Sequence, residues 1–232
     1  GEEKCEKGAM NVSDALKTRI SVRAFLPTLV EEGLIREILE IAKFAPSGGN
    51  VQPWQVHVVL GPARDRLVAT VKKAIAEDPL ADESDFPIYP PSLWEPYRTR
   101  RYALGEAMYE LLGIPREDKP ARLAHVARNF EFFGAPAGLF FSLDRNFNPN
   151  QWAHLGMLML AVSLVAEEKG LATCMQESWM LRARTVSKFL GLSETQQLFC
   201  GMALGYADPD APVNKLRSER APLEEFATFM KK

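Results

Sequence analysis

The feature that most limits the fold of this chain is an uncharged apolar run, LGMLMLAVSLVA, at residues 155–166. A membrane-spanning helix needs about 20 apolar residues, whereas this run is much shorter and is followed at once by two glutamates and a lysine. A helix that is apolar on every face is covered on every face. We therefore predict a helix over 150–169 that lies centrally in the core and also presses against a second subunit.

The rest of the chain reads as a mixture of helices and strands without internal repeats. Apolar residues at helical spacing and short β-branched runs mark the two kinds of element. Helices are predicted at 12–19, 31–45, 63–77, 95–113, 119–131, 150–169, 181–191 and 222–230, and strands at 54–60, 137–143, 171–175 and 198–206. This order predicts an α+β fold in which helices surround a mixed or mostly antiparallel central sheet.

Length and composition are those of one large domain, which we place at residues 11–232. The first ten residues lack the apolar segment of a signal peptide, and we interpret them as a flexible start or a cloning remnant. A net charge of −2 provides no basic face for nucleic acid or a membrane surface. The three cysteines are scattered and odd in number, which is typical of a reducing cytoplasm rather than of a disulfide scaffold.

The usual catalytic signatures are missing. The three histidines show no HExxH spacing, so no metal site is expected. The sequence contains no GxSxG nucleophile motif, and neither GxGxxG nor GxxxxGKS/T occurs as a phosphate-binding loop. If the chain does chemistry, a bound cofactor is expected to carry it.

Two basic stretches near the ends of the chain are candidates for holding an anion. In RISVRAF, Arg19, Ser21 and Arg23 alternate with apolar residues, so an extended chain projects them to one face. Two guanidiniums and a hydroxyl on one face suit a phosphate, because arginine–phosphate hydrogen bonds are charge-assisted and bidentate. The stretch KLRSERAPLEEF adds Arg217 and Arg220 near the other end. The alternative interpretation of either stretch is a solvated basic edge.

A polar, glycine-rich stretch, APSGGNVQPW, lies between a predicted helix and a predicted strand at residues 45–54. Taken alone, the stretch reads equally well as a plain connecting loop punctuated by proline and glycine. The order helix–loop–strand also differs from a P-loop, in which a strand precedes the loop and a helix follows it.

These stretches together resemble the signatures of the nitroreductase family of FMN-dependent enzymes. RISVRAF followed by APSGGNVQPW is similar to the family pattern Arg-x-Ser-x-Arg/Lys-x-Phe, a helix, and Pro-Ser-x-x-Asn-x-Gln-Pro-Trp. GLATCMQES at 170–178 resembles a third motif beside the flavin, and RSERAPLEEF resembles the C-terminal arginine motif. The matches occur in family order from residue 19 to residue 226, so the resemblance covers nearly the whole chain.

The resemblance implies a nitroreductase-like α+β fold, a homodimer that shares its domains, and FMN bound at the subunit interface. Arg19, Ser21, Arg23 and Arg220 would hold the phosphate, ribityl chain or ring oxygens of FMN, with Arg217 as a helper. From the other subunit, the glycine-rich loop would bring Pro46, Ser47 and Asn50 to the flavin, supported by Gln52. Backbone amides at Gln176 and Glu177 would face the ring edge. Many family members carry proline where this chain has Met175, which puts the turn before Gln176 in doubt.

The proline-rich segment 78–96 is too irregular for the core and begins an inserted region, about 78–130, which varies within the family. Its stretches WEPYRTRRY and NFEFFGAP resemble the branch that reduces nitroaromatic compounds. We therefore expect a lid in which Trp94, Tyr97, Arg98 and Phe133 stack on an aromatic substrate. The alternative is ordinary packing for Phe133 and a surface loop for Trp94.

The resemblance implies a cytoplasmic FMN-dependent oxidoreductase that passes electrons from NADH or NADPH to a nitroaromatic compound by a ping-pong mechanism. The flavin carries the chemistry, so no side chain is assigned a catalytic role. We expect no metal, nucleic-acid or membrane partner. Two alternatives stay open: another reduction on the same fold, such as dehalogenation or the reduction of free flavin or quinone, and a flavin-binding protein without turnover.

Overall fold

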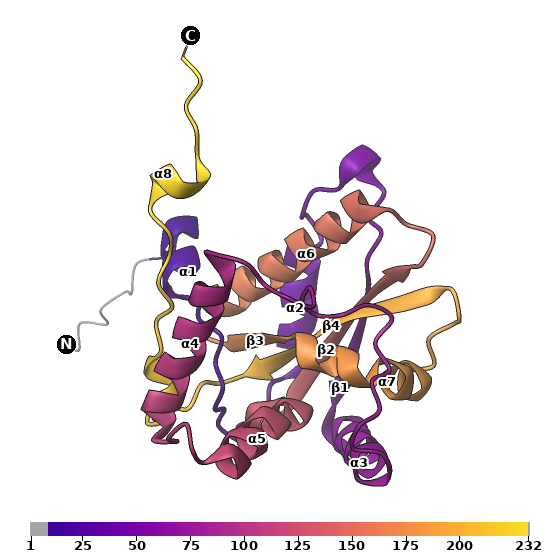
Figure 1. Cartoon of the computed structure of the whole chain (residues 1–232). Helices are drawn as coiled ribbons and strands as arrows, with labels where there is room; N and C mark the ends of the chain where they lie inside the picture. Colours follow the sequence, from indigo (N-terminus) through magenta and orange to yellow (C-terminus); the bar gives the residue numbers. More distant parts are fainter. Residues whose placement is uncertain (1–8, 232) are drawn as a thin grey trace, which may run out of the picture.

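The computed structural model describes residues 9–231 and has an α+β architecture built on one four-stranded sheet (Figure 1). The strands lie in the order β1–β2–β4–β3, and each neighbouring pair is antiparallel. Their bounds are β1 Gln55–Leu60, β2 Ala137–Asp144, β3 Ala172–Gln176 and β4 Gln196–Gly205. This confirms the predicted fold class and the four predicted strands.

Helices flank the sheet on both faces. Their bounds are α1 Val12–Thr18, α2 Glu32–Ala42, α3 Gly61–Glu77, α4 Tyr97–Leu112, α5 Lys119–Ala127, α6 Pro149–Glu168, α7 Ala183–Leu190 and α8 Leu223–Phe226. Short 3₁₀ turns lie at η1 Gly48–Asn50, η2 Arg128–Gly134, η3 Glu177–Arg182 and η4 Pro212–Lys215. Within the described part of the chain, no helix has the length and apolarity needed to cross a bilayer.

The central strands are buried on both sides because helices cover both faces of the sheet. Successive side chains of a strand point to alternate faces. On β2, Leu139, Phe141 and Leu143 belong to the core packed under α2 and α6. Phe140, which points to the other face, packs with residues of α3, α7 and η2. Two separate cores therefore lie on the two faces of one sheet.

Helix α6 is the apolar run that limited the fold. A capping box between Asn148 and Gln151 starts the helix, and Leu155, Leu158 and Val162 are buried against the sheet. Met157 and Leu160, on the other side, are 45% and 37% exposed in the single chain. The predicted central position is confirmed, and the second apolar face is uncovered within this one subunit.

Several predicted helices are shorter than expected, and the helices predicted at 119–131 and 222–230 lose the most at their C-terminal ends. The helix predicted at 119–131 ends at Ala127, because the chain then turns into η2, where Phe132 and Phe133 adopt positive φ angles of 54° and 52°. The helix predicted at 222–230 is reduced to α8 (Leu223–Phe226), which buries no residue and so gains little from packing. After α8 the chain runs away from the body of the molecule (Figure 1).

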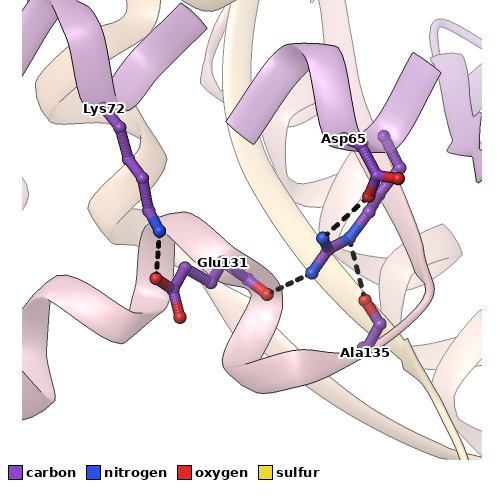
Figure 2. A network of polar contacts seen from close by, with 5 residues as sticks. Asp65, Lys72, Glu131 and Ala135 are labelled. Carbon is purple, nitrogen blue, oxygen red and sulfur yellow. Dashed lines mark hydrogen bonds and ion pairs between the residues drawn. The ribbon is translucent and has the colours of Figure 1, made fainter. Parts of the chain in front are cut away.

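The strained turn η2 is held by a polar network from α3 (Figure 2). The Arg64 guanidinium donates to the carbonyl oxygens of Glu131 at 2.7 Å and Ala135 at 3.1 Å, on either side of the two left-handed phenylalanines. Lys72 forms an ion pair with the Glu131 carboxylate. Left-handed non-glycine residues persist only where their surroundings hold them, and the Arg64 contacts supply that restraint.

Candidate cofactor site

The segment Arg19–Phe25 is held between two neighbours that lie far along the chain. On one side Ser21 forms a parallel bridge with Thr173 of β3, and the Val22 amide donates to the Thr173 carbonyl at 3.0 Å. On the other side Phe25 bridges to Ala207, just beyond β4. The extended backbone gives Arg19, Ser21 and Arg23 the alternating arrangement that the sequence predicts.

Asn214 joins the N-terminal basic segment to the C-terminal one. Its Oδ1 accepts the Arg23 amide at 3.0 Å, and its Nδ2 donates to the Ala24 carbonyl at 2.8 Å. The Arg217 guanidinium in turn donates to the Asn214 carbonyl at 2.9 Å. The structure thus brings Arg217 beside the Arg19–Phe25 segment. The Arg220 guanidinium bonds only locally, to Ser218 and the Glu219 carbonyl, and no contact with Arg19 is recorded.

The arginines of this region carry positive charge without neutralising carboxylates. Among residues 9–231, none of Arg19, Arg23, Arg217 and Arg220 forms an ion pair. The Nε of Arg19 is buried and has no hydrogen-bond partner in the described chain. A buried guanidinium donor without an acceptor is energetically costly, and an anionic ligand would supply the acceptor.

A surface depression of about 420 Å³ lies beside the same segment. Ile20 and Val22 line it together with Leu171, Lys215 and Arg217. Arg19 and Arg23 alternate with Ile20 and Val22 along the segment, and their charges act on the Cys174 thiol, which packs in the same core as Val22. Burial outweighs these charges and raises the pKa of that thiol to about 11.

The end of β3 is tied down by the side chain of Gln176. Its Nε2 donates to the Asn129 carbonyl at 2.8 Å, and its Oε1 accepts from Trp179 Nε1 at 3.0 Å. The strand continues through Met175 and turns only at Glu177, where η3 begins. The Gln176 side chain already bonds to Asn129 and Trp179. The predicted contact with the flavin would therefore come from the backbone amides of Gln176 and Glu177. That role stays a prediction.

The glycine-rich loop folds into the strained turn η1. Gly49, Asn50 and Gln52 have positive φ angles of 58°, 54° and 50°. Ser47 Oγ accepts the Gln52 amide at 2.9 Å, and Gln52 Nε2 donates to the Asn50 carbonyl at 3.1 Å, so Gln52 supports the loop as expected. Pro46 and Asn50 are exposed, and Ser47 is half-buried.

The loop and the arginines lie at opposite ends of α6. Gly48 contacts His154 near the start of the helix, whereas the depression beside Ile20 is lined by Glu167 near its end. Thirteen residues of helix separate the two positions, which corresponds to about 20 Å at 1.5 Å per residue. A single chain therefore presents two halves of the predicted site rather than one assembled pocket.

The predicted lid residues fall into two groups. Trp94 and Tyr97 are exposed and contact each other edge to face, with ring centroids 5.6 Å apart, and Arg98 pairs with Glu95 at 2.8 Å. Phe133, by contrast, is 2% exposed and lies in the core. The structure does not bring Phe133 together with the other three, and a substrate contact for any of them stays a prediction.

Comparison with known proteins now decides the family. Residues 16–206 match the family model described as the nitroreductase family. The chain belongs to the nitroreductase family. It is 40% identical to a 4-nitrobenzoate reductase of Pseudomonas putida, over 92% of both chains. It is 35% identical to a nitrobenzene nitroreductase of Ectopseudomonas oleovorans, over 94% of this chain and 96% of that one.

Solved structures agree with this nitroreductase assignment. The FMN and NADPH-dependent nitroreductase NfnB from Sphigopyxis sp. strain HMH superposes with a TM-score of 0.93 at 42% identity, covering 96% of this chain and all of that chain. NfnB from Mycobacterium smegmatis, solved in complex with NADPH, gives a TM-score of 0.88 at 34% identity, covering 94% and 97%.

Three residues that shape the site of this nitroreductase were not found from the sequence. Asn214 joins the basic segments, His154 contacts the loop, and Asn129 accepts from Gln176. Each acts on a residue more than 40 positions away in the chain. No local pattern announces such contacts, although Asn214 does immediately precede the basic stretch Lys215–Arg220.

Proposed function

We propose that this nitroreductase uses FMN to pass electrons from NADH or NADPH to a nitroaromatic compound. The observation that carries the proposal is the buried Arg19 Nε without an acceptor, in a group of arginines without carboxylate partners. The relatives named as nitrobenzoate and nitrobenzene reductases support the choice of acceptor. The NfnB structures support FMN and a nicotinamide donor.

The residues fit FMN by their chemistry. The flavin phosphate needs several strong donors, which the guanidiniums of Arg19 and Arg23 and the Ser21 hydroxyl would provide from one face of an extended segment. Arg217 and Arg220 would add charge from the C-terminal segment. Gly48 and Gly49 leave room for close approach of a planar ring, and Ser47 and Asn50 offer polar atoms to its edge.

When bound, FMN would take a hydride from the nicotinamide and deliver electrons to the nitro group. The chain's own part is to bind, orient and exclude water. Because the sequence has no GxGxxG motif for a second nucleotide, we propose that donor and acceptor use one pocket in turn, which is ping-pong turnover. The positive charge of the arginines would also stabilise negative charge on the bound cofactor.

We further propose a homodimer in which the loop of one subunit completes the arginine site of the other. The separation of the two half-sites along α6 supports this, as does the exposed apolar surface. Helices α1 and α2 both pack on α6, and this region exposes Val12, Leu16, Ile41, Phe44, Met157 and Leu160. An obligate interface of this kind buries above about 2,000 Å². Sedimentation at micromolar concentration should give a dimer; an FMN-bound, fully active monomer would contradict it.

Residues 11–232 are proposed to form one domain whose inserted region, about 78–130, covers the site. Trp94, Tyr97, Arg98 and Phe133 are the proposed substrate contacts. We also propose the cytoplasm as the location, since Cys174 and Cys200 are buried free thiols, as in a reducing compartment. Cys5 lies outside the described residues.

One anaerobic experiment tests the proposed function. The purified protein should carry FMN, bleach when NADH or NADPH is added, and recover its absorbance when 4-nitrobenzoate or nitrobenzene follows. Recovery with a quinone, free flavin or a halogenated aromatic, but not with either nitro compound, would favour another reduction on this fold. Bound FMN that neither donor bleaches would indicate a flavin-binding protein without turnover.

A further inference from the structure

We propose that His154 is a positioning residue: its imidazole accepts a hydrogen bond that fixes the glycine-rich loop, residues 46–52, in the conformation that meets the cofactor. The effect on FMN rests on the proposed function. The contact between His154 and the loop is a property of the chain itself and is testable without flavin.

The contact is direct and closely fitted. The Gly48 amide donates to His154 Nε2 at 3.3 Å. A Cβ on residue 48 would lie 3.1 Å from Cε1 of the same ring, which is tighter than ordinary van der Waals contact. Glycine at position 48 therefore allows the backbone to approach the imidazole closely enough for the hydrogen bond to form.

The loop depends on this bond because its other hydrogen bonds are internal. Ser47 bonds to Asn50 and Gln52, and Gly48 bonds to Val51. Among residues 9–231, the Gly48–His154 bond is the only hydrogen bond that links residues 46–52 to another element. A turn with left-handed Asn50 and Gln52 is conformationally strained and needs external restraint.

The bond also assigns the tautomer of the ring. An imidazole nitrogen that accepts a hydrogen bond carries its lone pair there, so the proton of neutral His154 lies on Nδ1. That Nδ1 is buried and has no partner in the described chain. Without the acceptor role of Nε2, nothing recorded in the structure would favour this tautomer over the other.

The place of His154 on α6 makes it a firm anchor. It lies in the second turn of a 20-residue helix that starts with a capping box and packs on the sheet. The same helix exposes Met157 and Leu160 on the face proposed to meet the second subunit. Through His154, the loop is thus tied to the element that would also place it relative to the other subunit.

The test compares three variants of the full-length protein. His154→Phe keeps a planar ring but removes the acceptor, His154→Gln restores an amide oxygen, and His57→Phe is the matched control at another half-buried histidine. We expect His154→Phe to weaken FMN binding by about 3- to 10-fold, the value of one lost hydrogen bond. His154→Gln should recover most of the affinity, and His57→Phe should leave it unchanged.

Two spectroscopic readouts do not need flavin. Nitrogen-15 NMR of histidine-labelled apoprotein should give His154 the Nδ1–H tautomer, and hydrogen exchange of the Gly48 amide should accelerate in His154→Phe but not in His154→Gln. An Nε2–H tautomer, or unchanged exchange in a folded His154→Phe, would overturn the proposal. If His154→Phe fails to fold, the wild-type tautomer still decides, because an Nδ1–H ring supports the proposal and an Nε2–H ring overturns it.

The outcomes separate this proposal from the proposed function. A wild-type protein that binds no FMN, with the expected tautomer and exchange, would reject the flavin role and retain the anchor. A wild-type protein that binds FMN, with equal affinity in all three variants, would retain the flavin role and reject His154 as its positioning residue.

Discussion

The indole of Trp179 covers Gly201 so closely that a Cβ on residue 201 would lie 2.3 Å from its Cδ1. Gly201 is paired with Gln176 across the β3–β4 ladder, and Trp179 Nε1 donates to Gln176 Oε1 at 3.0 Å. The missing side chain at residue 201 thus lets one buried indole pack on the sheet and hold the end of β3 beside the candidate site.

Replacing Gly201 by alanine should therefore destabilise the fold, because the indole or the strand has to move. Overpacking of this kind typically lowers the free energy of unfolding by about 1–3 kcal/mol. Denaturant unfolding measures the effect. Gly33→Ala on α2, where an added Cβ meets nothing within 4 Å, is the control and should be neutral or slightly stabilising. Equal stability of both variants would show that the packing is looser than described.

Arg19→Gln should loosen the cofactor. Hydrogen bonds to charged groups are worth about 1.5–3 kcal/mol, so FMN affinity is expected to fall tenfold or more. Titration of apoprotein with FMN provides the measurement. Arg36→Gln removes an exposed arginine that is paired with Glu32 and serves as the charge-matched control. Arg220→Ala tests the C-terminal arginine in the same assay, and wild-type affinity there would remove Arg220 from the site.

Asn50→Leu should change the flavin site without unfolding the protein, since the residue is exposed on the loop. It keeps much of the volume but removes the donor and the acceptor, at about 1–3 kcal/mol for cofactor atoms left unpaired. Gly49→Val should act similarly, because Gly49 has a φ of 58° that a β-branched residue rarely adopts. FMN affinity and the rate of flavin reduction are the readouts. Parent-like values in both variants would reduce the loop to a connection.

Arg64→Ala should destabilise the turn η2. The substitution removes the guanidinium that donates to the two carbonyl oxygens on either side of the left-handed Phe132 and Phe133, and each such bond is worth about 1.5–3 kcal/mol. Thermal unfolding should show the loss, and Arg66→Ala, at an exposed site on the same helix, should show little. A folded Arg64→Ala of wild-type stability would mean that packing alone holds the turn.

Alkaline pH should weaken the fold through its buried cysteines. Burial raises the pKa of the Cys174 thiol to about 11, whereas an unfolded chain loses that proton near pH 8.5. Between these values the unfolded state binds fewer protons, so the free energy of unfolding falls as pH rises. Burial raises the pKa of Cys200 as well. A Cys174→Ala/Cys200→Ala variant should lose less stability than wild type between about pH 8.5 and 11; parallel curves would contradict this.

The sequence predicted most elements because their signals are local. The apolar run of α6, the β-branched strand of β1 and the alternation around Ser21 each report on residues that touch their near neighbours. Helix and strand positions followed, with errors mainly at ends. The prolines and polar residues on either side of Gly48–Asn50 also indicated an unusual loop.

What the sequence could not predict depends on contacts between distant residues. Phenylalanine has no preference for positive φ, so nothing local distinguishes Phe132 and Phe133 from a continuing helix; the restraint comes from Arg64, 67 residues from Glu131. Likewise the bond between Gly48 and His154 spans 106 residues. Such contacts form only in the folded protein, and neither segment alone carries a sequence pattern that predicts them.

The bond between the Arg23 amide and Asn214 spans 191 residues. During synthesis Arg23 is therefore made well before its partner. At about 5–20 residues per second, a ribosome needs roughly 10–40 s to make the second partner after the first. Throughout that interval the nascent Arg19–Phe25 segment exists without the neighbour that holds its outer side. If this segment binds FMN as proposed, the complete site forms only late in synthesis, and premature termination near the C-terminus would leave an almost complete polypeptide without the Asn214 contact.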